Sequence, residues 1–110
     1  MEEKMTNTEK RLRQHIFRED NGRIMMTVNV LDPKESTVGN IMFLMNNTPE
    51  KQLQNCLNYL IEGGYIRISG PKGEKFSGQL DDSCKDYSVI LTAAGTEILM
   101  GIRENPAIDV

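Results

Sequence analysis

The segment from Thr48 to Gly64 constrains the fold more than any other part of the chain. In Thr48-Pro49-Glu50 a hydroxyl can cap a helix, a proline has the φ angle of a first turn, and an acid lies near the positive end of the helix dipole. Apolar residues then recur at helical spacing, and Gly63-Gly64 supplies the positive φ angle that ends many helices. We expect a helix here whose buried face contains Leu53, Cys56, Leu57, Leu60 and Ile61.

Two short alternating segments after this helix predict a β-hairpin. Residues 65–68 alternate directly after the glycine pair, and residues 87–91 alternate again before Thr92. The intervening residues 69–86 are polar and contain several glycines, so they predict a long hairpin tip.

The chain before residue 31 predicts a helix followed by a strand. Residues 6–18 contain neither glycine nor proline and place Leu12, His15 and Ile16 at helical spacing. Asn21-Gly22 is a typical chain break, and residues 24–30 then alternate with a period of two, with Met26, Val28 and Val30 on one side. We expect a first helix over 6–18 and a short edge strand over 24–30.

Two further helices complete the pattern. Asp32-Pro33 resembles a helix start, with Ser36 or Thr37 as alternative caps, and the helix runs to about Met45. Its apolar face consists of Val38, Ile41, Met42 and Met45. A last short helix capped by Thr92 carries Ile98, Leu99 and Ile102, and Pro106 prevents its extension.

This order of elements predicts an α+β, mainly helical winged helix-turn-helix fold. Three helices pack on a small antiparallel sheet of three short strands, and the hairpin after the third helix forms a long wing. We expect a single domain over residues 1–110, with a core at about 6–103, the wing loop at 69–86 and a tail at 104–110.

Three stretches carry a resemblance to a known group of proteins. They are Glu50-Lys51-Gln52-Leu53 with the helix-to-strand junction that follows, Val89-Ile90-Leu91-Thr92-Ala93-Ala94-Gly95, and Gly101-Ile102-Arg103-Glu104-Asn105-Pro106. The junction resembles that of bacterial winged-helix regulators. Together the stretches are similar to small uncharacterised winged-helix proteins of Mu-like phages and prophages, although here Met42, Phe43 and Met45 stand where such proteins favour Ala and Leu, and the wing is longer and more polar. The resemblance implies a phage or prophage origin and a non-enzymatic role.

Charge and hydropathy exclude several classes of protein. The net charge of -3 argues against a surface that attracts nucleic acid everywhere, so any DNA contact must be local. No apolar run is long enough to span a membrane, and Met1-Glu2-Glu3-Lys4 lacks the features of a signal peptide, which predicts a cytoplasmic protein.

The residues that could perform chemistry form no recognisable site, so we expect no catalytic residue, metal or cofactor. His15 is the single histidine and fits a half-buried position on a helix face. Asp81-Asp82 has too few ligands for a metal and fits a solvated loop, and Gly70-Pro71-Lys72-Gly73 fits a turn at the base of the wing.

The sulfur-containing residues fit structural positions. Cys56 is expected to be a buried core thiol, whereas Cys84 is expected to be exposed in the wing. The methionines at 25, 26, 42 and 45 are expected to fill the core, with a pliable binding surface as the alternative.

The candidate functional surface is the outward side of the third helix together with the wing. The helical wheel turns Lys51, Asn55 and Asn58 outward and leaves Gln54 at the flank. Amides can read adenine edges, and Lys51, Lys72 and Lys75 can hold phosphates of double-stranded DNA.

Nearby acidic residues leave a second hypothesis open. The third helix also carries Glu50 and Glu62, and the wing carries Glu74, Asp81, Asp82 and Asp86, so this surface is not basic. In the alternative hypothesis the chain forms a homodimer or binds a phage protein and touches no nucleic acid. The most basic stretch, with Lys10, Arg11, Arg13, Arg18 and Arg23, fits a solvated helix face or a docking surface.

Overall fold

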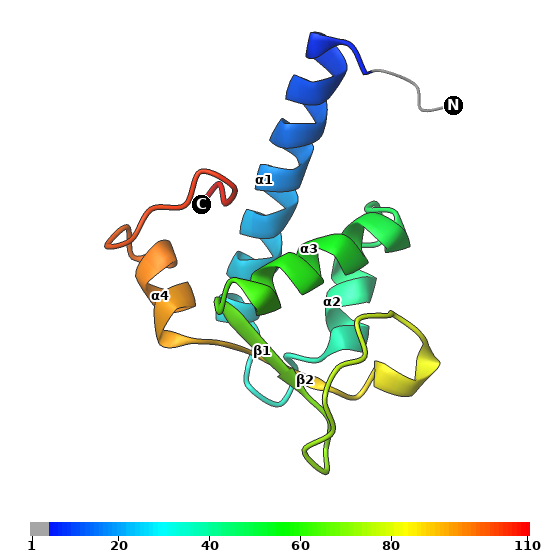
Figure 1. The fold of residues 1–110 in the computed structure, drawn as a ribbon. Helices are drawn as coiled ribbons and strands as arrows, with labels where there is room; N and C mark the ends of the chain where they lie inside the picture. Colours follow the sequence, from blue (N-terminus) through cyan, green and yellow to red (C-terminus); the bar gives the residue numbers. More distant parts are fainter. Residues whose placement is uncertain (1–4) are drawn as a thin grey trace.

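The computed structural model describes residues 5–110, which contain four α-helices, one short 3-10 helix and a two-stranded antiparallel sheet (Figure 1). The described part of the chain is α+β and mainly helical, as predicted. The observation on Met1, Glu2, Glu3 and Lys4 concerns residues outside the described range.

Helix α1 (Asn7–Val30) replaces the predicted first helix, chain break and strand. The strand over residues 24–30 is wrong, because its alternate residues do not share a face: Val28 is 6% exposed, whereas Met26 and Val30 are 51% and 81% exposed. The buried stripe instead has helical spacing and consists of Asp20, Asn21, Gly22, Ile24, Met25 and Val28.

Gly22 lies inside α1 because the C-terminal tail crosses the helix at that point. A Cβ atom at this position would lie 1.8 Å from the Asp109 carbonyl oxygen. The Asp109 N–H donates to the Arg18 carbonyl oxygen (3.1 Å), and the Asn21 side-chain amide donates to the Ala107 carbonyl oxygen (3.0 Å). Asn21-Gly22 is therefore a docking site for the tail, and the close approach of two backbones requires the glycine.

Helix α2 (Val38–Leu44) starts later than Asp32-Pro33 suggests. The Asp32 carbonyl oxygen accepts hydrogen bonds in a turn that precedes the helix, and the Thr37 hydroxyl caps the helix by accepting from the Asn40 N–H (3.2 Å). The structure thus selects Thr37 from the two alternative caps, Ser36 and Thr37, that the sequence offers for this helix. The buried side of the helix consists of Val38 and Ile41, with Met45 directly after it.

Helix α3 (Glu50–Glu62) confirms the central sequence prediction. The expected hydroxyl cap from Thr48 is wrong, because Pro49 is the N-cap residue and no side chain caps the helix. Gly64 has a φ angle of 77° and leads into β1 (Ile66–Ser69). This strand pairs antiparallel with β2 (Ser88–Leu91), in the register that places Ile66 opposite Leu91.

The predicted third strand is reduced to a short edge segment before α2. Thr37 forms an isolated antiparallel bridge with Ser88. The Ser36 hydroxyl donates to the Val89 carbonyl oxygen (2.6 Å), and the Ser36 carbonyl oxygen accepts from the Val89 N–H (2.9 Å). Residues 36–38 thus occupy the place at the sheet edge that was expected for residues 24–30.

The loop between β1 and β2 has two parts. The hairpin tip (residues 70–75) is closed by a bridge between Ser69 and Lys75, so the predicted turn at Gly70-Pro71-Lys72-Gly73 lies at the end of a hairpin and not at the base of the wing. The return segment (residues 76–87) contains the 3-10 helix Asp82–Cys84. The expected exposure of Cys84 is wrong, because the return segment folds back onto the helices and leaves this thiol 3% exposed.

Helix α4 (Ala93–Leu99) begins at Thr92, whose hydroxyl accepts from the Gly95 N–H (3.1 Å), as predicted. Ile102 lies beyond the helix and is 76% exposed, so its assignment to the apolar face is wrong.

The tail contributes to the core, which was expected to end near residue 103. Ile108 is 6% exposed and belongs to the hydrophobic cluster. The Asn105 side-chain amide donates to the hydroxyls of Tyr59 and Tyr65, both at 2.9 Å. These contacts hold the tail against α3 and the start of β1.

The hydrophobic core surrounds the C-terminal half of α1, which contacts α2, α3, α4 and β2. The N-terminal half of α1 extends beyond the other helices (Figure 1), and Leu12 is 58% exposed there.

The half-buried position expected for His15 is wrong: its side chain is 59% exposed, and its Nε2 lies 3.2 Å from a Glu19 carboxylate oxygen. Of the methionines expected in the core, Met25 and Met45 are buried and Met42 is half-buried, while Met26 is half-exposed.

Candidate functional site

The outward strip of α3 is narrow because neighbouring elements cover both of its flanks. The exposed residues of the strip are Lys51, Asn55 and Glu62. On the side of α1, the ring of Tyr59 packs edge-on against Phe17 with ring centroids 5.0 Å apart. On the opposite side lies the return segment. The strip therefore offers one cation, one amide and one anion.

The return segment occupies two of the three candidate amides of α3, the flanking Gln54 and the outward Asn58. The Leu80 N–H donates to the Gln54 side-chain oxygen (2.9 Å), and the Asn58 side-chain amide donates to the Gly78 carbonyl oxygen (3.0 Å). Both amides are half-buried. The prediction that Asn58 faces outward as a free group is wrong, because Gln54 and Asn58 attach the return segment to α3.

Lys51 and Asn55 instead share a groove with the projecting half of α1. The groove has a volume of about 630 Å³, and Ile16, Phe17 and Pro49 form its apolar part. Its polar groups are Arg13, Gln14, Lys51, Gln52 and Asn55, and no carboxylate lines it. The groove thus combines two cations with three amides.

Sequence reasoning missed the contribution of Arg13 and Gln14 to this groove. The basic residues of the first helix were visible, but their position depends on α1 continuing past Gly22 and crossing α3. The Gln52 amide donates to the Asp20 carboxylate, which joins the two helices at the inner end of the groove. Correlated changes at positions 13 and 51 among related sequences are the signal that would have shown these two residues to lie close together.

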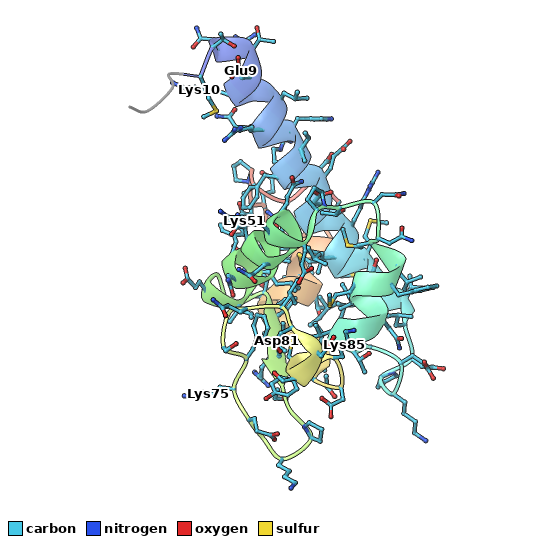
Figure 2. The ribbon with its side chains drawn as sticks, turned by 90° about the vertical axis from the view of Figure 1, so that its right-hand side faces the viewer. Glu9, Lys10, Lys51, Lys75, Asp81 and Lys85 are labelled. Atoms are coloured by element: carbon cyan, nitrogen blue, oxygen red, sulfur yellow. The ribbon has the colours of Figure 1, made fainter. Side chains whose placement is uncertain are left out.

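The hairpin tip carries the two predicted lysines of the loop, Lys72 and Lys75, and both are exposed. Figure 2 shows Lys75 and Lys51 on the same side of the molecule, while α2 lies on the other side. Glu74 lies between the two lysines in sequence and accepts a hydrogen bond from the Lys72 N–H (2.6 Å). The tip is therefore weakly cationic.

The return segment makes the other edge of α3 acidic. Hydrogen bonds from the Ser83 hydroxyl and N–H lower the pKa of Asp81, so this carboxyl is ionised at neutral pH. Asp82 forms an ion pair with Lys85 (2.8 Å), and this contact raises the pKa of the lysine. With Asp86 also exposed, this edge repels a phosphate backbone, whereas the α1 edge attracts one.

The state of the Cys56 thiol and the distribution of metal-ligating side chains limit the chemistry of the described residues. Burial, together with the negative charge of Asp20, raises the pKa of the Cys56 thiol to about 12, so it is not a nucleophile at neutral pH. No group of three or more metal-ligating side chains occurs within residues 5–110. In the same residues, no helix has the length and apolar character needed to cross a membrane.

Comparison of the chain with protein-family models, with curated proteins and with solved structures found no match. The winged-helix assignment and the resemblance to proteins of Mu-like phages therefore stay predictions.

Proposed function

We propose that this chain is a non-enzymatic winged-helix protein that binds double-stranded DNA through α3, the groove between α1 and α3, and the hairpin tip. The observation that carries the proposal is the groove, whose lining contains Arg13, Lys51 and Asn55 and no carboxylate. The succession of three helices, a hairpin and a last helix supports the winged-helix part of the proposal.

The groups have separate roles in this proposal. Asn55 is the exposed amide of α3 that reads a base edge, and one good bidentate contact contributes about 1–3 kcal/mol of discrimination. The cations Arg13, Lys51, Lys72 and Lys75 contact phosphates, which fix the position of the protein but carry no sequence information. Binding is therefore mainly electrostatic, with limited sequence preference.

The salt dependence of DNA binding tests the proposal directly. Four phosphate contacts predict that log Kobs falls with log[salt] with a slope of about -3.6 for B-form DNA. Fluorescence anisotropy with a labelled duplex, between about 50 and 200 mM salt, measures this slope. K51A is expected to reduce the slope by about 0.9, whereas N55A is expected to weaken sequence preference and leave the slope unchanged.

A matched control is available on the acidic edge of α3. Lys85 is exposed like Lys51 but is paired with Asp82, so K85A removes one positive charge away from the groove. We expect K85A to leave the salt slope unchanged. Absence of duplex binding at low salt, or equal effects of K51A and K85A, would contradict the proposal.

A second candidate is a protein-interaction module that binds no nucleic acid. The observation that favours it is the return segment, which uses Gln54 and Asn58 for its own attachment and places Asp81 and Asp82 beside α3. This candidate predicts no duplex binding in the anisotropy experiment and a stable complex with a protein instead.

A further inference from the structure

Large apolar side chains are exposed on the outer sides of the C-terminal half of α1 and of α2. We define the α1–α2 face by Met26, Val30, Phe43 and Leu44, which are 51%, 81%, 74% and 54% exposed. A groove of about 380 Å³ runs between the two helices and is lined by Met26, Thr27, Val30, Leu31 and Leu44. Phe43 precedes Leu44 in α2 and is exposed outside the lining of this groove.

These side chains do not belong to the core, because each helix already buries its opposite side. In α1 the buried residues include Ile24, Met25 and Val28, and in α2 they are Val38 and Ile41. The α1–α2 face is thus a second apolar surface on the same helices. A contiguous exposed apolar patch on a small protein commonly marks an interaction site.

The charge distribution indicates which partner fits this face. No ionisable residue lines the groove between the helices, and Arg23 is the single ionisable residue in the adjoining groove. In a two-fold symmetric pair each surface meets its own copy, so a charged surface repels itself. The projecting half of α1 is basic and the return segment is acidic, whereas the groove of the α1–α2 face presents no ionisable side chain to its own copy.

We propose that the α1–α2 face joins two copies of this chain into a two-fold symmetric homodimer. Symmetric pairing places Phe43 of each copy against the groove of the other and removes all four large side chains from water. The inference does not depend on DNA binding, because Lys51 and Lys75 lie on the opposite side of the molecule from α2 (Figure 2).

The size of the face sets the expected strength of the dimer. The patch presents roughly 400 Å² per copy, the size of the largest apolar patch on an ordinary monomer. A symmetric pair then buries roughly 800–1,000 Å² in total, which is below the range of strong, permanent interfaces. We therefore expect a reversible dimer with a dissociation constant of about 10–100 μM.

Sedimentation velocity of the full chain between about 5 and 500 μM tests the proposal, because this range spans the expected dissociation constant. The native chain is expected to shift from monomer to dimer. F43D places a buried charge on the two-fold contact and is expected to raise the dissociation constant at least about 100-fold, so that the monomer predominates at every concentration in this range. V30D is a second variant with the same expectation, and both side chains are exposed enough for the monomer to fold, which circular dichroism verifies.

L12D is the matched control, since it makes a comparable change at a residue of α1 that is 58% exposed but lies outside the face. We expect L12D to leave the dissociation constant unchanged. Monomeric behaviour of the native chain up to the highest concentration overturns the proposal and leaves the face to a different partner. A dimer that survives F43D and V30D, or one that L12D abolishes, also overturns it. K51A with N55A must remain dimeric even if DNA binding is lost.

Discussion

Replacement of Gly22 tests how the C-terminal tail holds α1. In G22A the new Cβ atom would lie 1.8 Å from the Asp109 carbonyl oxygen, and ordinary contact begins at 3.4 Å, so the tail must retreat by about 1.6 Å. This retreat breaks the hydrogen bond from the Asp109 N–H to the Arg18 carbonyl oxygen and exposes part of Ile108.

Three contributions to the free energy of unfolding set the sign and the size of the change in G22A. The lost hydrogen bond contributes about 1 kcal/mol, and burial of an isoleucine contributes about 1.5–3 kcal/mol when complete. An alanine in place of a glycine inside a helix returns about 1 kcal/mol. With part of the Ile108 burial lost, we therefore expect G22A to lower the free energy of unfolding by about 1–2 kcal/mol.

The control is the same substitution in a chain that ends at Ala107 and therefore lacks Asp109. There the obstacle is absent, and G22A is expected to raise the free energy of unfolding by about 0.5–1 kcal/mol through helix propensity. Urea unfolding followed by far-ultraviolet circular dichroism measures all four chains. If G22A stabilises the full chain and the shortened chain alike, the tail does not dock against α1 as described.

Three further substitutions test other contacts. G95A puts a Cβ atom 2.1 Å from the Tyr65 carbonyl oxygen, so α4 must move from β1; we expect a loss of about 2–3 kcal/mol in urea unfolding, and an unchanged midpoint would contradict this contact. N105A removes the hydrogen bonds to the Tyr59 and Tyr65 hydroxyls and is expected to cost about 1–2 kcal/mol, but little when both tyrosines are already phenylalanine; an equal loss in both backgrounds would exclude these bonds as its cause. The buried Cys56 thiol keeps its proton up to a pKa of about 12, while the unfolded chain releases it near pH 9, so stability is lost as pH rises above 9. Relative to C56A, the native chain is expected to lose about 1 kcal/mol of unfolding free energy between pH 9 and pH 10, and parallel pH profiles would refute this.

The sequence was sufficient to predict those helices whose bounds depend only on residues close to them in the chain. The bounds of α3 follow from Pro49, from leucines at helical spacing and from the positive φ angle of Gly64, all of which act within the helix or at its ends. The Thr92 cap of α4 is local in the same way. These elements could be predicted because no distant contact competes with their local preferences.

The prediction failed where a distant segment decides the local structure. Asn21-Gly22 has the composition of a turn, yet both residues are helical because the tail, more than 80 residues later, docks on them. Residues 24–30 satisfy a period of two and also helical spacing, and packing against the core selects the helix.

The candidate site shows the same division between local and distant effects. The helical wheel placed Lys51 and Asn55 correctly, because the direction of a side chain follows from the helix itself. It could not show that the return segment bonds to Gln54 and Asn58, since that segment is polar in sequence but buries Leu80 against the helices.

The two proposed surfaces together limit how a dimer can use DNA. The groove and hairpin tip face one side of the molecule, and α2 lies on the other side (Figure 2). A two-fold pair joined at the α1–α2 face therefore turns its two copies of Lys51 and Lys75 away from each other. Such a dimer cannot place both α3 helices in successive major grooves of one straight duplex, which is the arrangement that creates palindromic half-sites. If both proposals are correct, each copy binds DNA separately and the dimer brings two duplex segments together.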